Sequence, residues 1–195
     1  MKLSSRQKRQ PQTLNRQTRY QIDQSGKIEN TEKPTVIAIS NHTTLTIIIP
    51  AKVKRQFQEI CRHRGLTRLY VYVLFAIGVN LLLIKLKTRS KITIDTEYPG
   101  KERLIKDLIK IFMGKQKISL DFARIGNKPK VHYAAHNVYT KKKPADKTIS
   151  LQEILQTTKK ADGRLRECLS TLVGARSRSL GVYYHPKTKK SNKKP

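Results

Sequence analysis

The first half of the chain alternates short apolar runs with an amphipathic segment. Two β-branched runs, residues 36–40 and 45–49, are bounded by prolines and separated by four polar residues, 41–44, which predicts a β-hairpin. Apolar side chains then recur at helical spacing over residues 51–64, so an amphipathic helix is expected to follow the hairpin.

The pattern continues with alternating strands and helices. Residues 91–98 and 118–125 alternate as strands, and residues 101–112 and 130–141 carry apolar stripes at helical spacing. Strands that alternate with helices favour parallel neighbours joined by right-handed crossovers. The sequence therefore predicts an α/β fold, a mixed sheet with flanking helices, over residues 34–140.

Residues 69–84 are uncharged over 16 positions. This segment is shorter than the roughly 20 apolar residues that a membrane span needs, so we expect a buried core helix and no membrane partner. A buried β-hairpin and a membrane segment are the alternatives. After the charged stretch 141–147, Ser150 and Glu153 have the spacing of a capping box. A last helix is expected over residues 164–173.

The charge is concentrated at the ends of the chain. It carries 42 Lys and Arg against 13 Asp and Glu, a formal net charge of +29. We predict a disordered basic N-terminal arm over residues 1–33, the α/β core over 34–140, a linker with C-terminal helices over 141–174 and a disordered basic tail over 175–195. The acid-free N-terminus also has features of an organellar transit peptide, although it lacks an apolar helical face.

So large a positive charge predicts a polyanionic partner, DNA or RNA. Aromatic residues are scarce, which favours phosphate contacts over base stacking. Two cysteines provide no disulfide framework, so a cytoplasmic protein associated with a nucleoid or a ribonucleoprotein is expected. The candidate nucleic-acid-binding residues are Lys101, Lys128, Lys130, Arg124, Lys141, Lys142, Lys143, Arg9, Arg176 and Lys189.

The few acidic residues give the candidate chemistry. Asp95 and Glu97 lie on one face at the end of a predicted strand, where ligands bind in open α/β sheets. Two such carboxylates suit Mg²⁺ or Mn²⁺. Asp121 on the next strand and Glu59 on the first helix are further candidate catalytic acids. A zinc site involving His132 and His136, four residues apart on one helix, is an alternative.

The element order over residues 34–140 resembles the ribonuclease H-like fold, in its nuclease, resolvase and transposase variants. The segments IDTEYPGKE and ISLDFARIGNKPKVHYAA are also similar to a pattern in uncharacterised proteins of that class. The resemblance implies that Asp95 is a metal-binding aspartate, with Glu97 beside it and Glu59 as the helix-borne acid. It also implies an aspartate on the first strand, yet residues 33–58 contain no acid.

These observations leave three main functions open, and a membrane-surface protein anchored through residues 69–84 ranks behind them. Because the expected first-strand acid is missing, the leading prediction is a nucleic-acid-binding protein that holds DNA or RNA through phosphate contacts. The alternative is a metal-dependent nuclease that uses Asp95 and Glu97. A structural component of a ribonucleoprotein or DNA-processing complex is the third.

Overall fold

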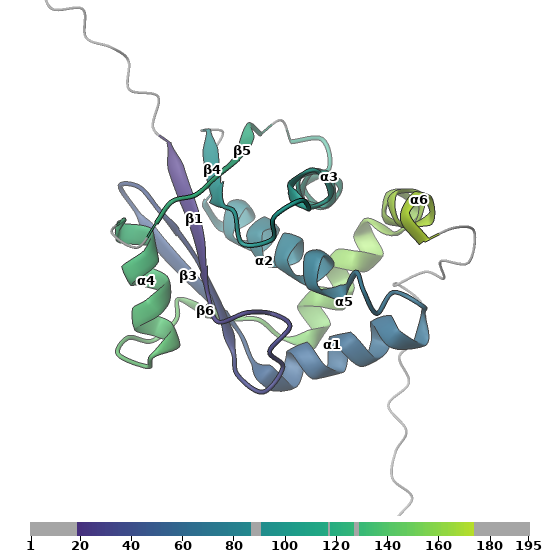
Figure 1. The fold of residues 1–195 in the computed structure, drawn as a ribbon, viewed down its shortest axis with the longest axis horizontal. Coiled ribbons are helices and arrows are strands. Elements are labelled where there is room, and N and C mark those ends of the chain that lie inside the picture. Colours follow the sequence, from purple (N-terminus) through teal and green to yellow (C-terminus); the bar gives the residue numbers. More distant parts are fainter. Residues whose placement is uncertain (1–18, 87–90, 117, 127–128, 174–195) are drawn as a thin grey trace, which may run out of the picture.

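A computed structural model describes residues 19–86, 91–116, 118–126 and 129–173. Its centre is a six-stranded mixed sheet with strand order β5-β4-β1-β2-β3-β6 (Figure 1). The strands in chain order are β1 Tyr20–Ser25, β2 Thr35–Ser40, β3 Thr44–Ile49, β4 Ile92–Asp95, β5 Leu120–Ala123 and β6 Lys147–Thr148. The α/β class and the mixed sheet predicted from the sequence are confirmed.

The sheet combines an antiparallel meander with parallel additions. Strands β1, β2 and β3 pair antiparallel, and the register Ser40↔Thr44 closes the predicted hairpin. Strand β4 pairs parallel to β1, and β5 pairs parallel to β4. The carboxyl ends of β1, β4 and β5 therefore lie at the same edge of the sheet.

Strand β1 corrects the predicted N-terminal arm. Residues 19–33 belong to the fold, and β1 is a central strand that pairs on both sides. The sequence YQIDQS contains one aliphatic residue, Ile22, so it lacks the apolar alternation on which the strand predictions relied. Strand β1 is held in the sheet by backbone pairing with its two apolar neighbours, β2 and β4. Residues 1–18 of the predicted arm lie outside the described residues.

The helices form two unequal layers on the sheet (Figure 1). Among the described helices, α4 is the one that covers one face, where Val131 and Ala135 pack against Val36 and Ala38. The other helices lie on the opposite side, over a core built on Ile22, Ile37, Ile94 and many side chains of α2. The helix bounds are α1 Ala51–His63, α2 Tyr70–Leu86, α3 Glu102–Met113, α4 Lys130–Tyr139, α5 Leu151–Lys160 and α6 Asp162–Val173.

Helix α2 is the expected buried core helix. Most of its side chains are buried, and Gly78 lets it lie close to β2, since a Cβ atom there would come within 2.6 Å of Ile37 Cδ1. None of the helices in the described part of the chain is long and apolar enough to cross a membrane.

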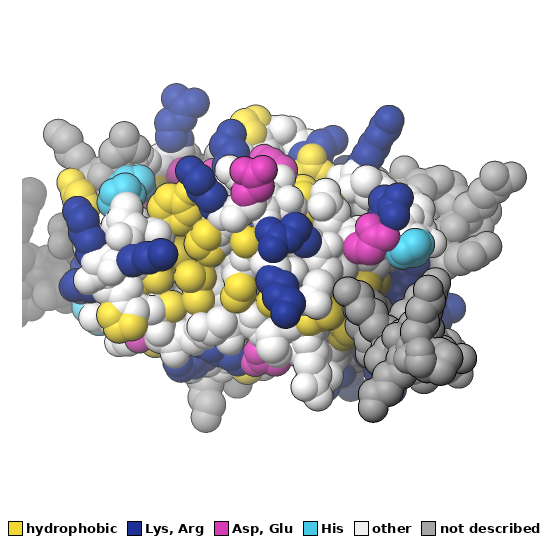
Figure 2. Space-filling view, turned by 90° about the horizontal axis from the view of Figure 1, so that it is seen from below, with side chains coloured by type: hydrophobic (Ala, Val, Ile, Leu, Met, Phe, Trp, Pro, Cys, Tyr) yellow, Lys and Arg dark blue, Asp and Glu magenta, His cyan; other side chains and the backbone are white. Residues whose placement is uncertain are grey.

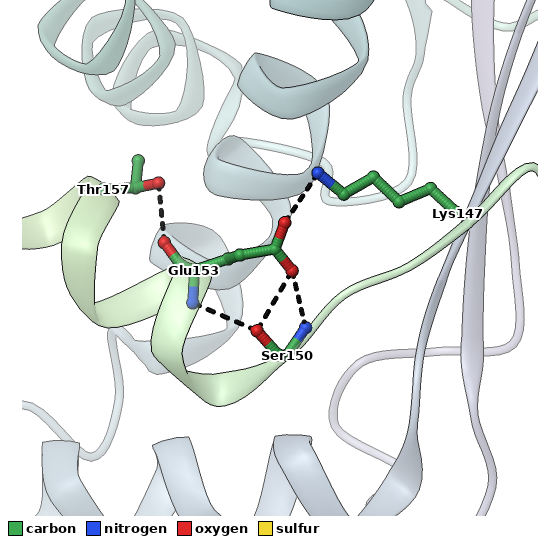
Figure 3. Close-up of polar contacts among 4 residues, drawn as sticks. All are labelled: Lys147, Ser150, Glu153 and Thr157. Atoms are coloured by element: carbon green, nitrogen blue, oxygen red, sulfur yellow. Dashed lines mark hydrogen bonds and ion pairs between the residues drawn. The ribbon is translucent and has the colours of Figure 1, made fainter.

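The C-terminal helices belong to the same core, since Ile154 and Leu165 are buried in it. The predicted capping box is present: Ser150 Oγ accepts from the Glu153 backbone N–H at 3.2 Å, and the Glu153 carboxylate accepts from the Ser150 N–H at 2.9 Å (Figure 3). The predicted linker 141–147 ends in β6, which pairs parallel to β3. The predicted tail 175–195 lies outside the described residues.

Candidate metal site

A buried carboxylate lies in the middle of the sheet. Asp23 on β1 is only 3% exposed and follows Ile22, which faces the main core, so the Asp23 side chain is on the α4 face. One carboxylate oxygen of Asp23 accepts from the Gln24 backbone N–H at 2.7 Å. The first strand therefore does carry an acid, and the expectation that it has none was wrong, because the first strand is β1 and not residues 36–40.

The neighbouring parallel strand places Asp95 beside Asp23. Ile22 of β1 is in register with Ile94 of β4, so the next residue of each strand, Asp23 and Asp95, lies on the same face. Asp95 Oδ1 accepts from the Ile125 backbone N–H at 2.7 Å. This hydrogen bond holds the Asp95 carboxylate against the segment that follows β5.

Glu97 completes the group from the loop after β4. Its backbone N–H donates to the Asp95 carbonyl oxygen at 2.9 Å, which turns the chain immediately after the strand. One carboxylate oxygen from each of Asp23, Asp95 and Glu97 lies within 4.8 Å of the others. Two of these residues, Asp95 and Glu97, are the pair expected from the sequence to hold a metal.

Burial and mutual repulsion make this group poorly suited to carry three negative charges alone. Burial, with the nearby Asp23 and Asp95 charges, raises the pKa of Glu97 to about 7. Burial also raises the pKa of Asp23, against the lowering effect of its hydrogen bonds. A divalent cation between the three side chains would offset both effects, and oxygen ligands are those that Mg²⁺ and Mn²⁺ prefer.

A histidine from α4 also reaches the group. His132 Nδ1 lies 2.9 Å from Asp23 Oδ2. An ionised carboxylate only accepts hydrogen bonds, so His132 donates from Nδ1 when Asp23 is ionised. The ring stacks on His136, with centroids 6.1 Å apart. Zinc binding by these two histidines was an alternative expected from the sequence, but within the described residues the candidate metal ligands that converge are Asp23, Asp95 and Glu97.

The other two predicted catalytic acids lie apart from this group. Asp121 forms an ion pair with Lys91 at 2.7 Å, and this pairing lowers the pKa of its exposed carboxyl. Glu59 on α1 forms ion pairs with Arg62 and His63, and the Arg62 contact lowers its pKa. Neither is a member of the carboxylate cluster, so we do not assign them a catalytic role.

The predicted basic residues are largely exposed. Lys101, Arg124, Lys130 and residues 141–143 all present their side chains to solvent. Figure 2 shows Lys and Arg side chains scattered over one face of the molecule, with few acidic side chains between them. Lys128, Arg9, Arg176 and Lys189 lie outside the described residues.

Asp23 was not predicted as a site residue from the sequence, although a signal for it was present, and His132 was predicted only as an alternative zinc ligand. Asp23 is the first acid in the chain and follows an isoleucine, as Asp95 does in the strand ITID. A repeated Ile-Asp pair on two strands of one sheet indicates two carboxylates on the same face.

Comparison with known proteins finds no matching family model, no matching curated protein and no matching solved structure.

Proposed function

We propose that this protein is a divalent-metal-dependent nuclease with a ribonuclease H-like arrangement of its core. The observation that carries the proposal is the convergence of Asp23, Asp95 and Glu97 within 4.8 Å. The resemblance drawn from the sequence implies an antiparallel set of strands followed by helix–strand repeats, with acids on the first strand and on the strand after the crossover. Asp23 on β1 and Asp95 on β4 have those positions.

The three carboxylates would hold Mg²⁺ or Mn²⁺, which when bound supplies an activated water and neutralises charge on a phosphodiester. The chain's own contribution is to orient these ligands. The Gln24 N–H fixes one oxygen of Asp23, and the Ile125 N–H fixes one oxygen of Asp95. His132 holds the second oxygen of Asp23 through its Nδ1.

A nucleic-acid substrate follows from the charge. The formal net charge of +29 on 195 residues attracts a polyanion, and the exposed lysines of the folded part bind phosphates without reading sequence. This extends the leading prediction from the sequence, which was phosphate-driven binding of DNA or RNA. The compartment proposed for it is the cytoplasm, in association with nucleic acid.

The direct test is cleavage of end-labelled DNA, RNA and hybrid substrates by the purified full chain in Mg²⁺ or Mn²⁺. We expect cleavage that EDTA abolishes and that Asp23→Asn and Asp95→Asn each reduce by at least about a hundredfold. Asp121→Asn is the matched control, because it removes the same charge from a neighbouring strand outside the cluster. No cleavage by the wild type, or equal loss in the control, would refute the proposal.

The second candidate function is nucleic-acid binding without cleavage, which the net charge alone favours. It predicts affinity that falls linearly with salt on logarithmic axes, by roughly a thousandfold or more between 50 and 200 mM for 6–10 phosphate contacts. Salt-dependent binding by a protein that neither binds Mn²⁺ nor cuts any of these substrates would favour this candidate over the nuclease.

A further inference from the structure

A cavity of about 650 Å³ opens between α2, the start of α3 and the connection from α1 to α2. Its volume falls within the range of about 300–1,000 Å³ that is typical of small-molecule sites. The walls include the half-buried side chains of Leu69, Tyr72 and Leu104. The cavity lies on the α2 side of the sheet, whereas the carboxylates are on the α4 face, so it is distinct from the candidate metal site.

The lining combines apolar side chains with two positively charged ones. Arg68 and Lys101 are both exposed and line the cavity, one before α2 and the other before α3. None of the side chains that line it is acidic. A Tyr ring, two leucines and two cations suit a flat heteroaromatic ring that carries a phosphate, which is the chemistry of a nucleotide.

A short turn joins this cavity to the candidate metal site. Lys101 N–H donates to the Tyr98 carbonyl oxygen at 3.0 Å, and Gly100 has the positive φ of 78° that the third position of a type II turn requires. A hydrogen-bonded turn keeps its first and last Cα atoms within about 7 Å. Glu97, a member of the carboxylate cluster, directly precedes this turn, and Lys101 at its end lines the cavity.

Tyr98 provides a second connection. Its ring packs edge-on against Tyr72, a wall of the cavity, with centroids 5.6 Å apart. Its hydroxyl lies 3.3 Å from the side-chain amide of Gln24, the residue that follows Asp23. One side chain therefore contacts the cavity wall on one side and the neighbour of the central carboxylate on the other.

We infer that this cavity is a subsite for an unpaired nucleotide of the substrate, beside the strand segment held at the carboxylates. The inference rests on the proposed function and deepens it, since it specifies a nucleic acid with a single-stranded segment next to the bond that is cut. A base that is paired within a duplex is stacked between its neighbours and does not enter such a cavity without being flipped out.

The test measures binding in EDTA, so it does not depend on cleavage. A fluorescent 20-nucleotide single strand and the same strand paired with its complement are titrated with the full-length protein. We expect Arg68→Ala/Lys101→Ala to weaken single-strand binding by about tenfold or more. Leu104→Trp, which fills the cavity without changing charge, should also weaken it while leaving duplex binding within about twofold.

The control is Lys85→Ala/Lys110→Ala, which removes the same charge from exposed positions on α2 and α3 that do not line the cavity. Circular dichroism and thermal unfolding establish that each variant folds. Equal losses on both substrates, a loss no larger than that of the control, or unchanged binding by Leu104→Trp would overturn the subsite. Selective losses in these variants, together with a wild type that does not bind Mn²⁺, would instead overturn the nuclease.

Discussion

Asp23 and His132 are 109 positions apart in the chain, yet their side chains meet at 2.9 Å between the central strand and the only helix described on its face of the sheet. The contact holds a carboxylate that is itself a member of the candidate metal cluster. A partner that fixes a ligand typically affects metal affinity or activity by 10–100-fold. The Asp23–His132 contact therefore couples the position of α4 to the geometry of the candidate metal site.

We expect His132→Ala to reduce cleavage by about 10–100-fold and to weaken Mn²⁺ binding measured by calorimetry. His132→Asn should recover part of the metal affinity, because an amide can still donate to Asp23. His136→Ala is the matched control on the same helix, since the hydrogen bond to Asp23 comes from His132 alone among these two histidines. Equal effects of the two alanine substitutions would contradict this role.

Metal binding should release a proton near neutral pH. Burial and the neighbouring carboxylates raise the pKa of Glu97 to about 7, so below that pH a cation has to displace the proton from this side chain. The apparent affinity for Mn²⁺ should rise up to tenfold per pH unit below pH 7 and level off above it. Calorimetry in two buffers of different ionisation enthalpy would measure the released proton. Affinity that is constant between pH 5.5 and 8 would contradict the assignment of Glu97.

The same carboxylate should lower the stability of the metal-free protein. The pKa of Glu97 is about 7 in the folded chain and near 4.5 when unfolded, so the folded state binds more protons between these values. Stability from this group is therefore full below pH 4.5 and is lost as the pH rises through 7. In EDTA at pH 8, the free energy of unfolding of Glu97→Gln should exceed that of the wild type by roughly 1–2 kcal/mol after allowance for solvent screening. The variant should therefore unfold at a higher temperature.

Saturating Mg²⁺ should reverse that order, because the cation stabilises the wild-type carboxylates and binds the variant weakly. Thermal unfolding with and without metal is the measurement. Glu59→Gln serves as the control, since this exposed carboxylate contacts Arg62 and His63 of its own helix and no other acid in the described part of the chain. If Glu97→Gln lowered the unfolding temperature in EDTA, the carboxylates would not be in electrostatic conflict.

The sequence predicted elements well where side-chain periodicity determines them. The helices have stripes of buried residues, as Ile105, Leu108 and Ile109 do in α3, and the hairpin of β2 and β3 has a β-branched pattern. Strand β1 could not be recognised in this way. It is held by ladders on both sides and uses one of its faces for a polar site, so polar residues replace the apolar alternation.

For the same reason, only part of the candidate site could be predicted: Asp95 and Glu97 were expected from the sequence, and Asp23 was not. Asp95 and Glu97 stood out because they end a clear strand, but alternation alone did not separate Asp95 from Asp121. The difference is tertiary: Asp95 lies beside Asp23 of the central strand, whereas Asp121 is on the next strand outward and pairs with Lys91. Which acids converge depends on strand order, and strand order depends on the strand that periodicity missed.

A buried lysine of α1 binds the loop between β1 and β2. Lys54 of α1 is fully buried, and its ammonium donates to the backbone carbonyls of Lys27 and Asn30 at 2.9 and 2.6 Å and to Thr35 Oγ1 at 2.9 Å. All three acceptors are neutral. Burial without a direct anionic partner lowers the pKa of Lys54 from 10.5 to about 8.

Lys54→Met should lower stability at pH 7 by about 1–3 kcal/mol, because two backbone carbonyls and the buried Thr35 hydroxyl lose their donor. Between pH 8 and 10.5 the unfolded wild type binds more protons than the folded one, so this lysine makes the wild type gain stability as pH rises. The variant lacks that gain, and the gap between the two proteins should widen from pH 8 to pH 10. Urea unfolding at pH 7, 8, 9 and 10 measures the gap, with exposed Lys52→Met as the control. A gap that stays constant or narrows would show that the pKa of Lys54 is not lowered in the fold.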